Sequence, residues 1–426
     1  MAEIKEQVIW EFADRLRLVV PFYGFSSSAI ELIFMKYMSD YSDVSSPEEF
    51  KTLMNYKDMF IMRKLDIKCV TNIFRMVESK YNIEQNLLDI VLDDLTKIFE
   101  DKREEYLFAV LSEFEIPKTS EEMSCLLEAI LSYGEKKDVS RTELSSTNTS
   151  LIKLVDKILD VKEDEIYMDS FAGFSKSSLR IDAKEYLGYE INPKVAAIAN
   201  MIMILSGKKN FTISNQNYYL TESHSVADKV FSDGPLCVNL SMDEYYRLGG
   251  ESRKGDYYTV KKSVESLKPN GRAVVTCVGS VLFRNDFRKL REQLTFRNLK
   301  AVIALPALWR GTSVSTNLLV LDNERVGNDV IMIDASSNDY IKKIDKRNIE
   351  LTDDAFNKII DSLNGKIIEG FSNVIPSEMI LCETEDQSWA PARYIKKKIE
   401  VDFRPSAEVK IELDKAYDDL YRMLKK

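Results

Sequence analysis

Residues 185–207 read EYLGYEINPKVAAIANMIMILSG, and this stretch carries the clearest signal of the fold class. The run EYLGYE is typical of a short strand and ends in an acid, Glu190. The residues after it predict a helix, because Pro193 suits a first turn, apolar side chains form one stripe and Gly207 suits a stop. A strand that passes directly into a helix is the repeating unit of a parallel sheet.

The same alternation continues on both sides of this unit. The apolar runs predict further strands at 165–169, 227–233, 272–279, 299–306 and 317–322. Helices are expected between them at 257–271, ending at the turn Pro269-Asn270-Gly271, and at 286–296. We therefore expect an α/β fold, a doubly wound, Rossmann-like domain over 151–340.

The flanking regions have a different pattern. Residues 1–133 are expected to form a helical domain, with helices near 8–20, 26–42, 86–99, 103–114 and 121–133, and the polar stretch 134–150 is expected to be a linker. Residues 341–426 are less regular until a final helix, whose apolar residues are spaced by three and four like the seam of a coiled coil: Val409, Leu413, Ala416, Leu420 and Met423. A partner-binding helix is the prediction for this end.

Composition and charge argue against several classes of protein. The chain has 426 residues, enough for two or three domains, and a net charge of −10, which disfavours a dedicated nucleic-acid coat but not a local basic face. Five scattered cysteines without a C-x-x-C pair, and His224 as the single histidine, argue against a disulfide framework or a metal site. There is no signal-peptide pattern and no run long enough to span a membrane, so a cytoplasmic protein is expected.

Several segments together resemble a known family. They are MDSFAGFSKSSL (168–179), LGYEINPKVAAIANMIMILSG (187–207), ADKVFSDGPL (227–236), SLKPNGRAVVTCVGSVLF (266–283) and LKAVIALPALWRGTSVSTNLLVLD (299–322), with IWEFADRLR, AIELIFMKYMSD, SEMI and WAPARYI nearer the ends. Their order is similar to that of the modification subunit of type I restriction–modification systems, an N6-adenine DNA methyltransferase. The resemblance implies S-adenosylmethionine as cofactor, adenine in double-stranded DNA as substrate, and assembly with a specificity subunit and a restriction subunit.

The cofactor motifs match this family only in part. Its loop D-P-x-x-G-x-G-G corresponds to 169–176, where Asp169 and Gly173 remain but Ser175 and Lys176 replace two glycines. Those glycines allow the backbone to approach the cofactor closely, so an ordinary strand-to-helix turn is an open alternative. Glu190 matches the acid that holds ribose hydroxyls. Thr147 lies in the place of an aromatic-Thr-Pro segment that has lost its aromatic and its proline.

The catalytic motif is also altered. The family pattern [DN]-P-P-[YFW] corresponds to Asp233, Gly234, Pro235 and Leu236, which follow the strand 227–233. Leucine cannot stack on a flipped adenine as an aromatic ring does, and such stacking is worth ~1–3 kcal/mol per base. We therefore expect a methyltransferase fold with weak or lost methyl transfer, in which Asp233 is a relic of an adenine-holding group.

Two alternatives stay open at this stage. An active methyltransferase would need another aromatic, such as Tyr245, to stack on the base, and a protein-binding scaffold would have lost DNA as well. DNA contacts are expected from the basic density at 284–310, namely Arg284, Arg288, Arg291 and Arg310, although a solvated helix face fits the same residues. Self-association, or pairing with an active methyltransferase subunit, is a further expectation that the sequence leaves open.

Overall fold

A computed structural model describes most of the chain. The described residues are 11, 14–16, 24–99, 104–137, 147–222, 224–308, 315–344, 349–382, 387–396 and 409–417. Contacts divide the chain into two units, 1–395 and 396–426. In the second unit residues 409–417 are helical and exposed, while Leu420 and Met423 of the predicted seam lie outside the described residues, as does most of the helix predicted at 8–20.

In the described residues before 147 the regular secondary structure is helical. It consists of α2 (Phe25–Asp40), α3 (Pro47–Met62), α4 (Ile67–Tyr81), α5 (Leu92–Phe99), α6 (Glu104–Glu113) and α7 (Ser120–Lys137), with a short 3-10 turn η1 (Leu88–Val91). Capping fixes several of their ends. The Ser46 side chain accepts from the Glu49 amide at the start of α3, and Asn82 ends α4 in the left-handed conformation. α2 is buried along most of its length and packs against its neighbours.

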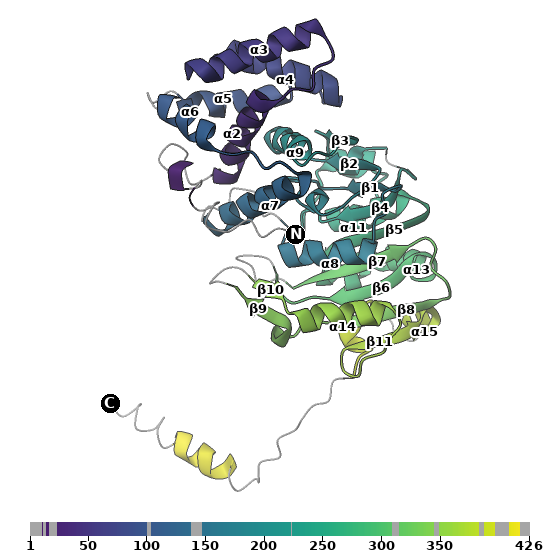
Figure 1. Ribbon diagram of the computed structural model, residues 1–426. Helices are drawn as coiled ribbons and strands as arrows, with labels where there is room; N and C mark the ends of the chain where they lie inside the picture. The colour runs from purple at the N-terminus through teal and green to yellow at the C-terminus, as the bar shows by residue number, and fades with distance from the viewer. Residues whose placement is uncertain are drawn as a thin grey trace. The chain divides into compact units, whose positions relative to one another are not determined.

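A nine-stranded sheet forms the centre of the first unit, in the order β11-β8-β6-β7-β5-β4-β1-β2-β3. Its strands are β1 (Ile166–Asp169), β2 (Glu185–Tyr189), β3 (Phe211–Ser214), β4 (Ala227–Ser232), β5 (Leu267–Val278), β6 (Leu299–Ala304), β7 (Thr316–Asp322), β8 (Asp329–Asp334) and β11 (Ser372–Pro376). The five strands β3-β2-β1-β4-β5 are parallel, and β7 is antiparallel to both of its neighbours. This arrangement confirms the predicted α/β fold (Figure 1).

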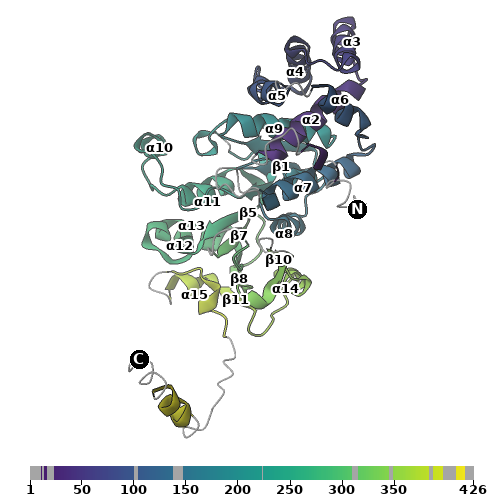
Figure 2. The same cartoon turned by 90° about the vertical axis from the view of Figure 1, so that its left-hand side faces the viewer.

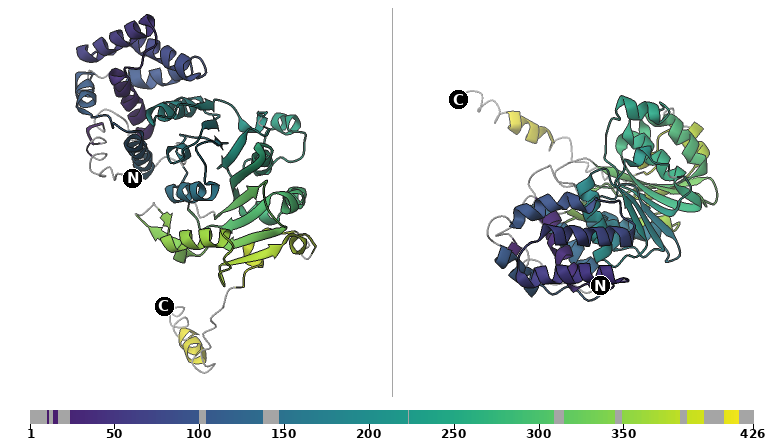
Figure 3. Two further views of the ribbon diagram at one scale, coloured as in Figure 1. Left: turned by 45° about the vertical axis from the view of Figure 1, so that its right-hand side comes forward. Right: turned by 90° about the horizontal axis from the view of Figure 1, so that it is seen from above.

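Helices cover both faces of this sheet (Figures 1 and 2). One hydrophobic core contains residues of α8 (Thr149–Leu159), α9 (Pro193–Leu205) and α14 (Asp353–Leu363), and α2 and α7 pack on α9. Figure 3 shows these N-terminal helices, purple to blue, on one side of the sheet. The second core contains residues of α11 (Gly255–Glu265), α12 (Gly279–Phe283), α13 (Arg288–Arg297) and α15 (Ser377–Cys382). No described helix is long and apolar enough to cross a membrane.

One local prediction was wrong. The helix expected at 257–271 ends at Glu265, and Pro269, Asn270 and Gly271 belong to β5 instead of forming a stop after the helix. The register between β4 and β5 shifts between Ala227 and Lys229, which accommodates this irregular start of the strand. The sheet also continues past residue 340, because β11 pairs with β8. The predicted domain boundaries stay a prediction.

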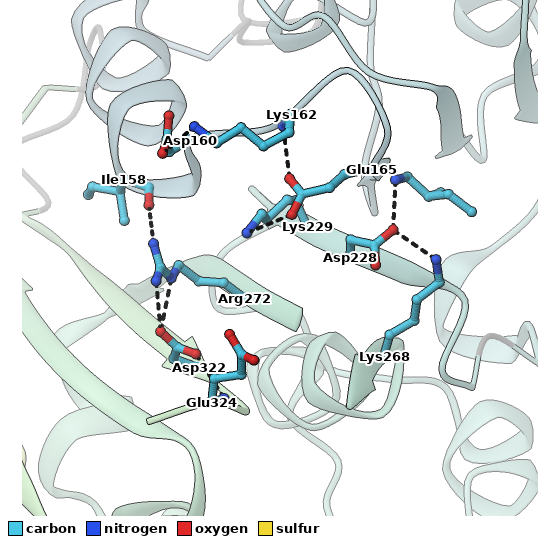
Figure 4. A network of polar contacts seen from close by, with 11 residues as sticks. Ile158, Asp160, Lys162, Glu165, Asp228, Lys229, Lys268, Arg272, Asp322 and Glu324 are labelled. Atoms are coloured by element: carbon cyan, nitrogen blue, oxygen red, sulfur yellow. Dashed lines mark hydrogen bonds and ion pairs between the residues drawn. The ribbon is translucent and has the colours of Figure 1, made fainter. Parts of the chain in front are cut away.

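Charged residues connect the strands at one edge of the sheet (Figure 4). Arg272 of β5 pairs with Asp322 of β7 at 3.0 Å, and Asp228 of β4 pairs with Lys268 at 2.8 Å. Glu165, the residue before β1, pairs with Lys229 at 3.2 Å. Glu165 and Asp228 lie at the amino ends of β1 and β4, so this network holds the edge opposite to the carboxyl ends of those strands.

Candidate functional site

A cavity of about 720 Å³ lies at the carboxyl ends of β1, β2 and β4. The chain runs from β1 outward to β2 and β3 and then returns to β4 on the other side of β1. Open α/β sheets bind their ligands at such a switch point. The cavity is lined by all eight residues that the sequence predicted for the cofactor and catalytic motifs: Thr147, Asp169, Gly173, Glu190, Asp233, Gly234, Pro235 and Leu236.

The Asp233 carboxylate already has two internal partners. The Thr147 hydroxyl donates to its Oδ2 at 2.6 Å, and the Thr276 hydroxyl of β5 donates to its Oδ1 at 2.6 Å. Burial raises the pKa of Asp233 from 3.8 to about 6, although both hydrogen bonds act in the opposite direction. The acid therefore connects the start of α8 to β4 and β5.

Asp169 is buried at the end of β1. It accepts hydrogen bonds from the Ser177 hydroxyl and, at 3.2 Å, from the Phe171 amide. Burial raises its pKa from 3.8 to about 7, and the charges of Asp233 and Glu190 add to that rise. The hydrogen bonds fold the loop 169–177 back onto the strand end.

Glu190 follows β2 and fixes the same loop from the other side. Its Oε2 accepts from the Gly173 amide at 3.2 Å and its Oε1 from the Asn192 amide at 2.7 Å. Burial raises the pKa of Glu190 above its usual value, against the effect of these backbone hydrogen bonds. Every carboxylate oxygen of Asp169, Glu190 and Asp233 thus accepts a hydrogen bond from the protein itself.

The loop after β1 keeps the first glycine of the family motif, Gly173, but has Ser175 and Lys176 in place of the next two. Gly173 has φ +50° and Ser175 has φ +53°, a conformation that costs a residue with a Cβ roughly 1–2 kcal/mol. Ser175 is fully buried and its hydroxyl has no hydrogen-bond partner. The buried Lys176 amine donates to the Thr147 carbonyl at 3.2 Å, so a side chain crosses from this loop to the start of α8.

One wall of the cavity is aromatic. Phe171, Tyr218 and Tyr219 meet edge to face with ring centroids 5.3 and 5.5 Å from Phe171, and Tyr189 lies 5.4 Å from Tyr218. The Tyr218 and Tyr219 hydroxyls pair with Ser266 and Thr259. These rings were missed in the sequence, although NQNYYL directly follows the strand at 211–214 and the strand-end argument applies to it equally.

Other tyrosines lie outside this wall. Tyr245 is on α10 (Met242–Arg247), where its ring packs against Tyr246 at 5.3 Å, and it is not among the cavity-lining residues. Figure 2 shows α10 extending away from the sheet beside α11. Tyr257 and Tyr258 are buried in the second core. Aromatic rings therefore line the cavity, but Tyr245, which was considered as the ring that stacks on the base, is not one of them.

The turn after β4 is tightly packed against the loop after β1. A Cβ on Gly234 would come within 2.8 Å of Cε2 and 3.0 Å of Cζ of Phe171. A contact of 2.8 Å is shorter than real Cβ atoms show, so a proline at position 234 would require the Phe171 ring to shift. Leu236, in the place of the motif's aromatic, is half-buried at the cavity.

The four arginines of the expected basic face are placed differently. Arg284 and Arg288 are exposed, and each pairs with an acid of its own segment, Asp286 at 2.9 Å and Glu292 at 3.2 Å. Arg291 is fully buried and donates to the carbonyls of Val281, Arg284 and Gln387. Arg310 lies outside the described residues. Arg291 thus has a structural role and is not part of an exposed basic face.

The described part of the chain holds no cluster of three histidine, cysteine or acidic side chains that could bind a metal ion. The fold and the cavity at its switch point define an α/β protein built on a nucleotide-cofactor scaffold. The chain belongs to the N-6 DNA Methylase family, whose model matches residues 128–402. S-adenosylmethionine is the cofactor expected for this family.

Known proteins resemble this chain in sequence and in fold. The chain is 24% identical to the type I restriction enzyme MpnII methylase subunit of Mycoplasma pneumoniae, over 85% of this chain and 83% of that protein. Its structure is similar to the type I restriction–modification methyltransferase subunit from Streptococcus thermophilus, with a TM-score of 0.69 and 19% identity over 92% of this chain and 99% of that one. It is also similar to a chain from a structure of a type I restriction–modification system, with a TM-score of 0.68 and 14% identity over 99% of this chain and 97% of that one. The structural likenesses establish the fold.

Proposed function

We propose that this protein is a modification-subunit-like component of a type I restriction–modification assembly that associates with DNA and whose methyl transfer is weak or lost. The family assignment and the Mycoplasma pneumoniae relative support the first part. The altered motifs support the second, since Ser175, Lys176, Gly234 and Leu236 depart from the family pattern in the two loops that form the cavity.

One observation carries the proposed loss of transfer. The acid that should accept the amine of a flipped adenine, Asp233, has its oxygens engaged by Thr147 and Thr276 at 2.6 Å each. The aromatic residue that should stack on the base is Leu236. An incoming adenine would have to share acceptors with two short hydrogen bonds and would gain no stacking from the turn.

The residues fit the family cofactor only in part. A cavity of this size, an acid after β2 and an aromatic wall suit an adenine nucleoside. The loop after β1 does not suit the rest of the molecule, because Ser175 and the crossing side chain of Lys176 stand where the family has glycines. When bound in this family, the cofactor supplies a methyl group.

The proposed partners follow from the family. They are double-stranded DNA, a specificity subunit that reads the sequence and, in a full system, a restriction subunit. The exposed helix 409–417 presents Val409 and Leu413, which suits a helical partner. Self-association, or pairing with an active methyltransferase subunit, remains part of the proposal.

Fluorescence anisotropy with a labelled duplex at low salt tests the DNA association. We expect binding that weakens steeply as salt rises, because phosphate contacts release counterions. Reversing Arg284 and Arg288 to glutamate should weaken it by at least about tenfold, whereas reversing Lys342 and Lys343 on β9 (Ile341–Lys343) should change it less. Absence of any binding at low salt would contradict the proposal and favour a pure protein scaffold.

A further inference from the structure

We propose that the α10 arm, residues 239–254, is a movable wall of the cavity that the hydrogen bond between Asn217 and Glu244 holds closed. We call this hydrogen bond the latch. Opening of the arm admits an adenine nucleoside to the cavity. The ligand class rests on the proposed function, whereas the latch itself does not.

The base of the arm is a two-stranded ribbon. The Leu240 amide donates to the Arg253 carbonyl at 2.9 Å, and Asn239 forms an antiparallel β-bridge with Lys254. α10 lies between these two legs, at the tip of the ribbon, and extends away from the sheet (Figure 2). The arm is therefore joined to the body of the protein at its base.

α10 itself has little packing against that body. None of its six residues is buried, and the side chains of Met242 and Tyr246 are exposed. The Tyr245 ring lies against Tyr246 and Gly250, which belong to the arm as well. Elements with so few buried contacts open locally at a small cost in free energy.

The latch links α10 to the segment after β3. Nδ2 of Asn217 donates to Oε1 of Glu244 at 2.8 Å, and both residues line the cavity. Oε2 of Glu244 accepts from the Ser241 amide at 2.8 Å, which fixes the carboxylate on α10. Oδ1 of Asn217 accepts from the Tyr219 amide at 3.0 Å and caps the short helix η3 (Tyr218–Leu220). Both side chains of the latch are thus held in place by their own segments.

Two glycines follow α10, and the chain beyond them is anchored. Gly249 and Gly250 have φ +84° and +71°, which glycine adopts without the strain of a Cβ. Ser252 is buried, and its amide donates to the Tyr258 hydroxyl of α11 at 3.3 Å. We therefore expect the movement to be confined to 241–250, with the return leg fixed on α11.

Hydrogen exchange of the ligand-free protein tests the latch. Asn217→Asp keeps the oxygen that caps η3 but replaces the donor to Glu244 by a like charge. Amides of 243–250 should exchange at least about fivefold faster in this variant than in the wild type. Asn210→Ala, which removes an exposed side-chain hydrogen bond to a carbonyl, is the matched control and should leave these amides unchanged.

Two results would overturn the latch. One is unchanged exchange at 243–250 in Asn217→Asp. The other is faster exchange that appears only in Asn217→Ala and extends to 218–221, because it would show that Asn217 acts through the cap of η3 alone.

The same measurement with millimolar adenosine tests the ligand. We expect adenosine to slow exchange at 243–250 by at least about threefold in the wild type, and cytidine to have no such effect. Protection of 169–177 without protection of 243–250 would overturn the movable wall. Absence of protection by adenosine, or equal protection by cytidine, would overturn the ligand class. The latch test needs no ligand and the DNA titration needs no nucleoside, so each can fail separately.

Discussion

The hydroxyl of Thr147 donates a 2.6 Å hydrogen bond to Asp233, across 86 positions of sequence, and the Thr276 hydroxyl binds the other oxygen of the same carboxylate at 2.6 Å. The residue that best matches the family's adenine-holding acid is therefore part of the internal hydrogen bonding that closes the site.

Removing either threonine hydroxyl should destabilise the protein through Asp233. Thr147→Val and Thr276→Val are each expected to cost about 1–2 kcal/mol at pH 8, where the carboxylate is ionised, because a hydrogen bond to a charged group is lost. The loss should be smaller at pH 5, below the pKa of about 6. Urea unfolding at both pH values measures it, with Thr71→Val, which bonds only a helix carbonyl, as control. Equal costs at both pH values would contradict this reading.

Asp169 should make stability fall as pH rises. Its pKa is raised from 3.8 to about 7, so the folded state binds the proton more tightly than the unfolded chain does. The stabilisation is complete below about pH 4 and is lost as pH rises through 7. Asp169→Asn should therefore gain roughly 1–3 kcal/mol at pH 8 relative to the wild type and little at pH 4.

Asp228 provides the control of opposite sign. Burial opposes its ionisation, but Lys268 and the Ile166 amide outweigh that effect and hold the pKa of Asp228 below its usual value. Its contribution is present at neutral pH and is lost as pH falls through the lowered pKa. Asp228→Asn should lose stability at pH 8, and a gain there would contradict a stabilising role for the Asp228 ion pair shown in Figure 4.

Ser175 stores backbone strain that glycine would relieve. Ser175→Gly should raise the free energy of unfolding by about 1 kcal/mol, because φ +53° favours glycine and the buried hydroxyl without a partner is removed. Ser178→Gly, three residues on and outside the left-handed region, should lose stability instead. Chemical denaturation of both variants decides the point, and destabilisation by Ser175→Gly would show that the hydroxyl has an unrecognised function.

Arg291 is expected to stabilise the fold, whereas Arg288 is expected to contact DNA. Arg291→Met is expected to cost about 2 kcal/mol or more, since three carbonyls lose a buried charged donor. Arg288→Met should stay within roughly 0.5 kcal/mol, because its pair with Glu292 is exposed. Thermal unfolding checks stability and anisotropy checks DNA binding, and an Arg288 variant that loses stability without losing DNA would contradict the assignment.

The mostly parallel sheet and the strand-end position of Asp233 followed from local pattern, whereas the other motif residues at the cavity followed from the resemblance to the family. The strands at 165–169, 185–190 and 227–233 each end near an acid, and parallel strands bring those ends to one edge. Tyr218 and Tyr219 of the aromatic wall were missed because β3, the strand that precedes them, was not predicted. The contact between Phe171 and Gly234 joins two loops far apart in the chain, and the buried position of Arg291 depends on Gln387, so no local pattern encodes either.

Transfer of a labelled methyl group from S-adenosylmethionine to unmethylated DNA of mixed sequence tests the central claim most directly. Wild-type protein and Asp233→Ala are compared under identical conditions. We expect both to give incorporation at background level. Incorporation by the wild type that is lost in Asp233→Ala would contradict it and would identify an active adenine methyltransferase.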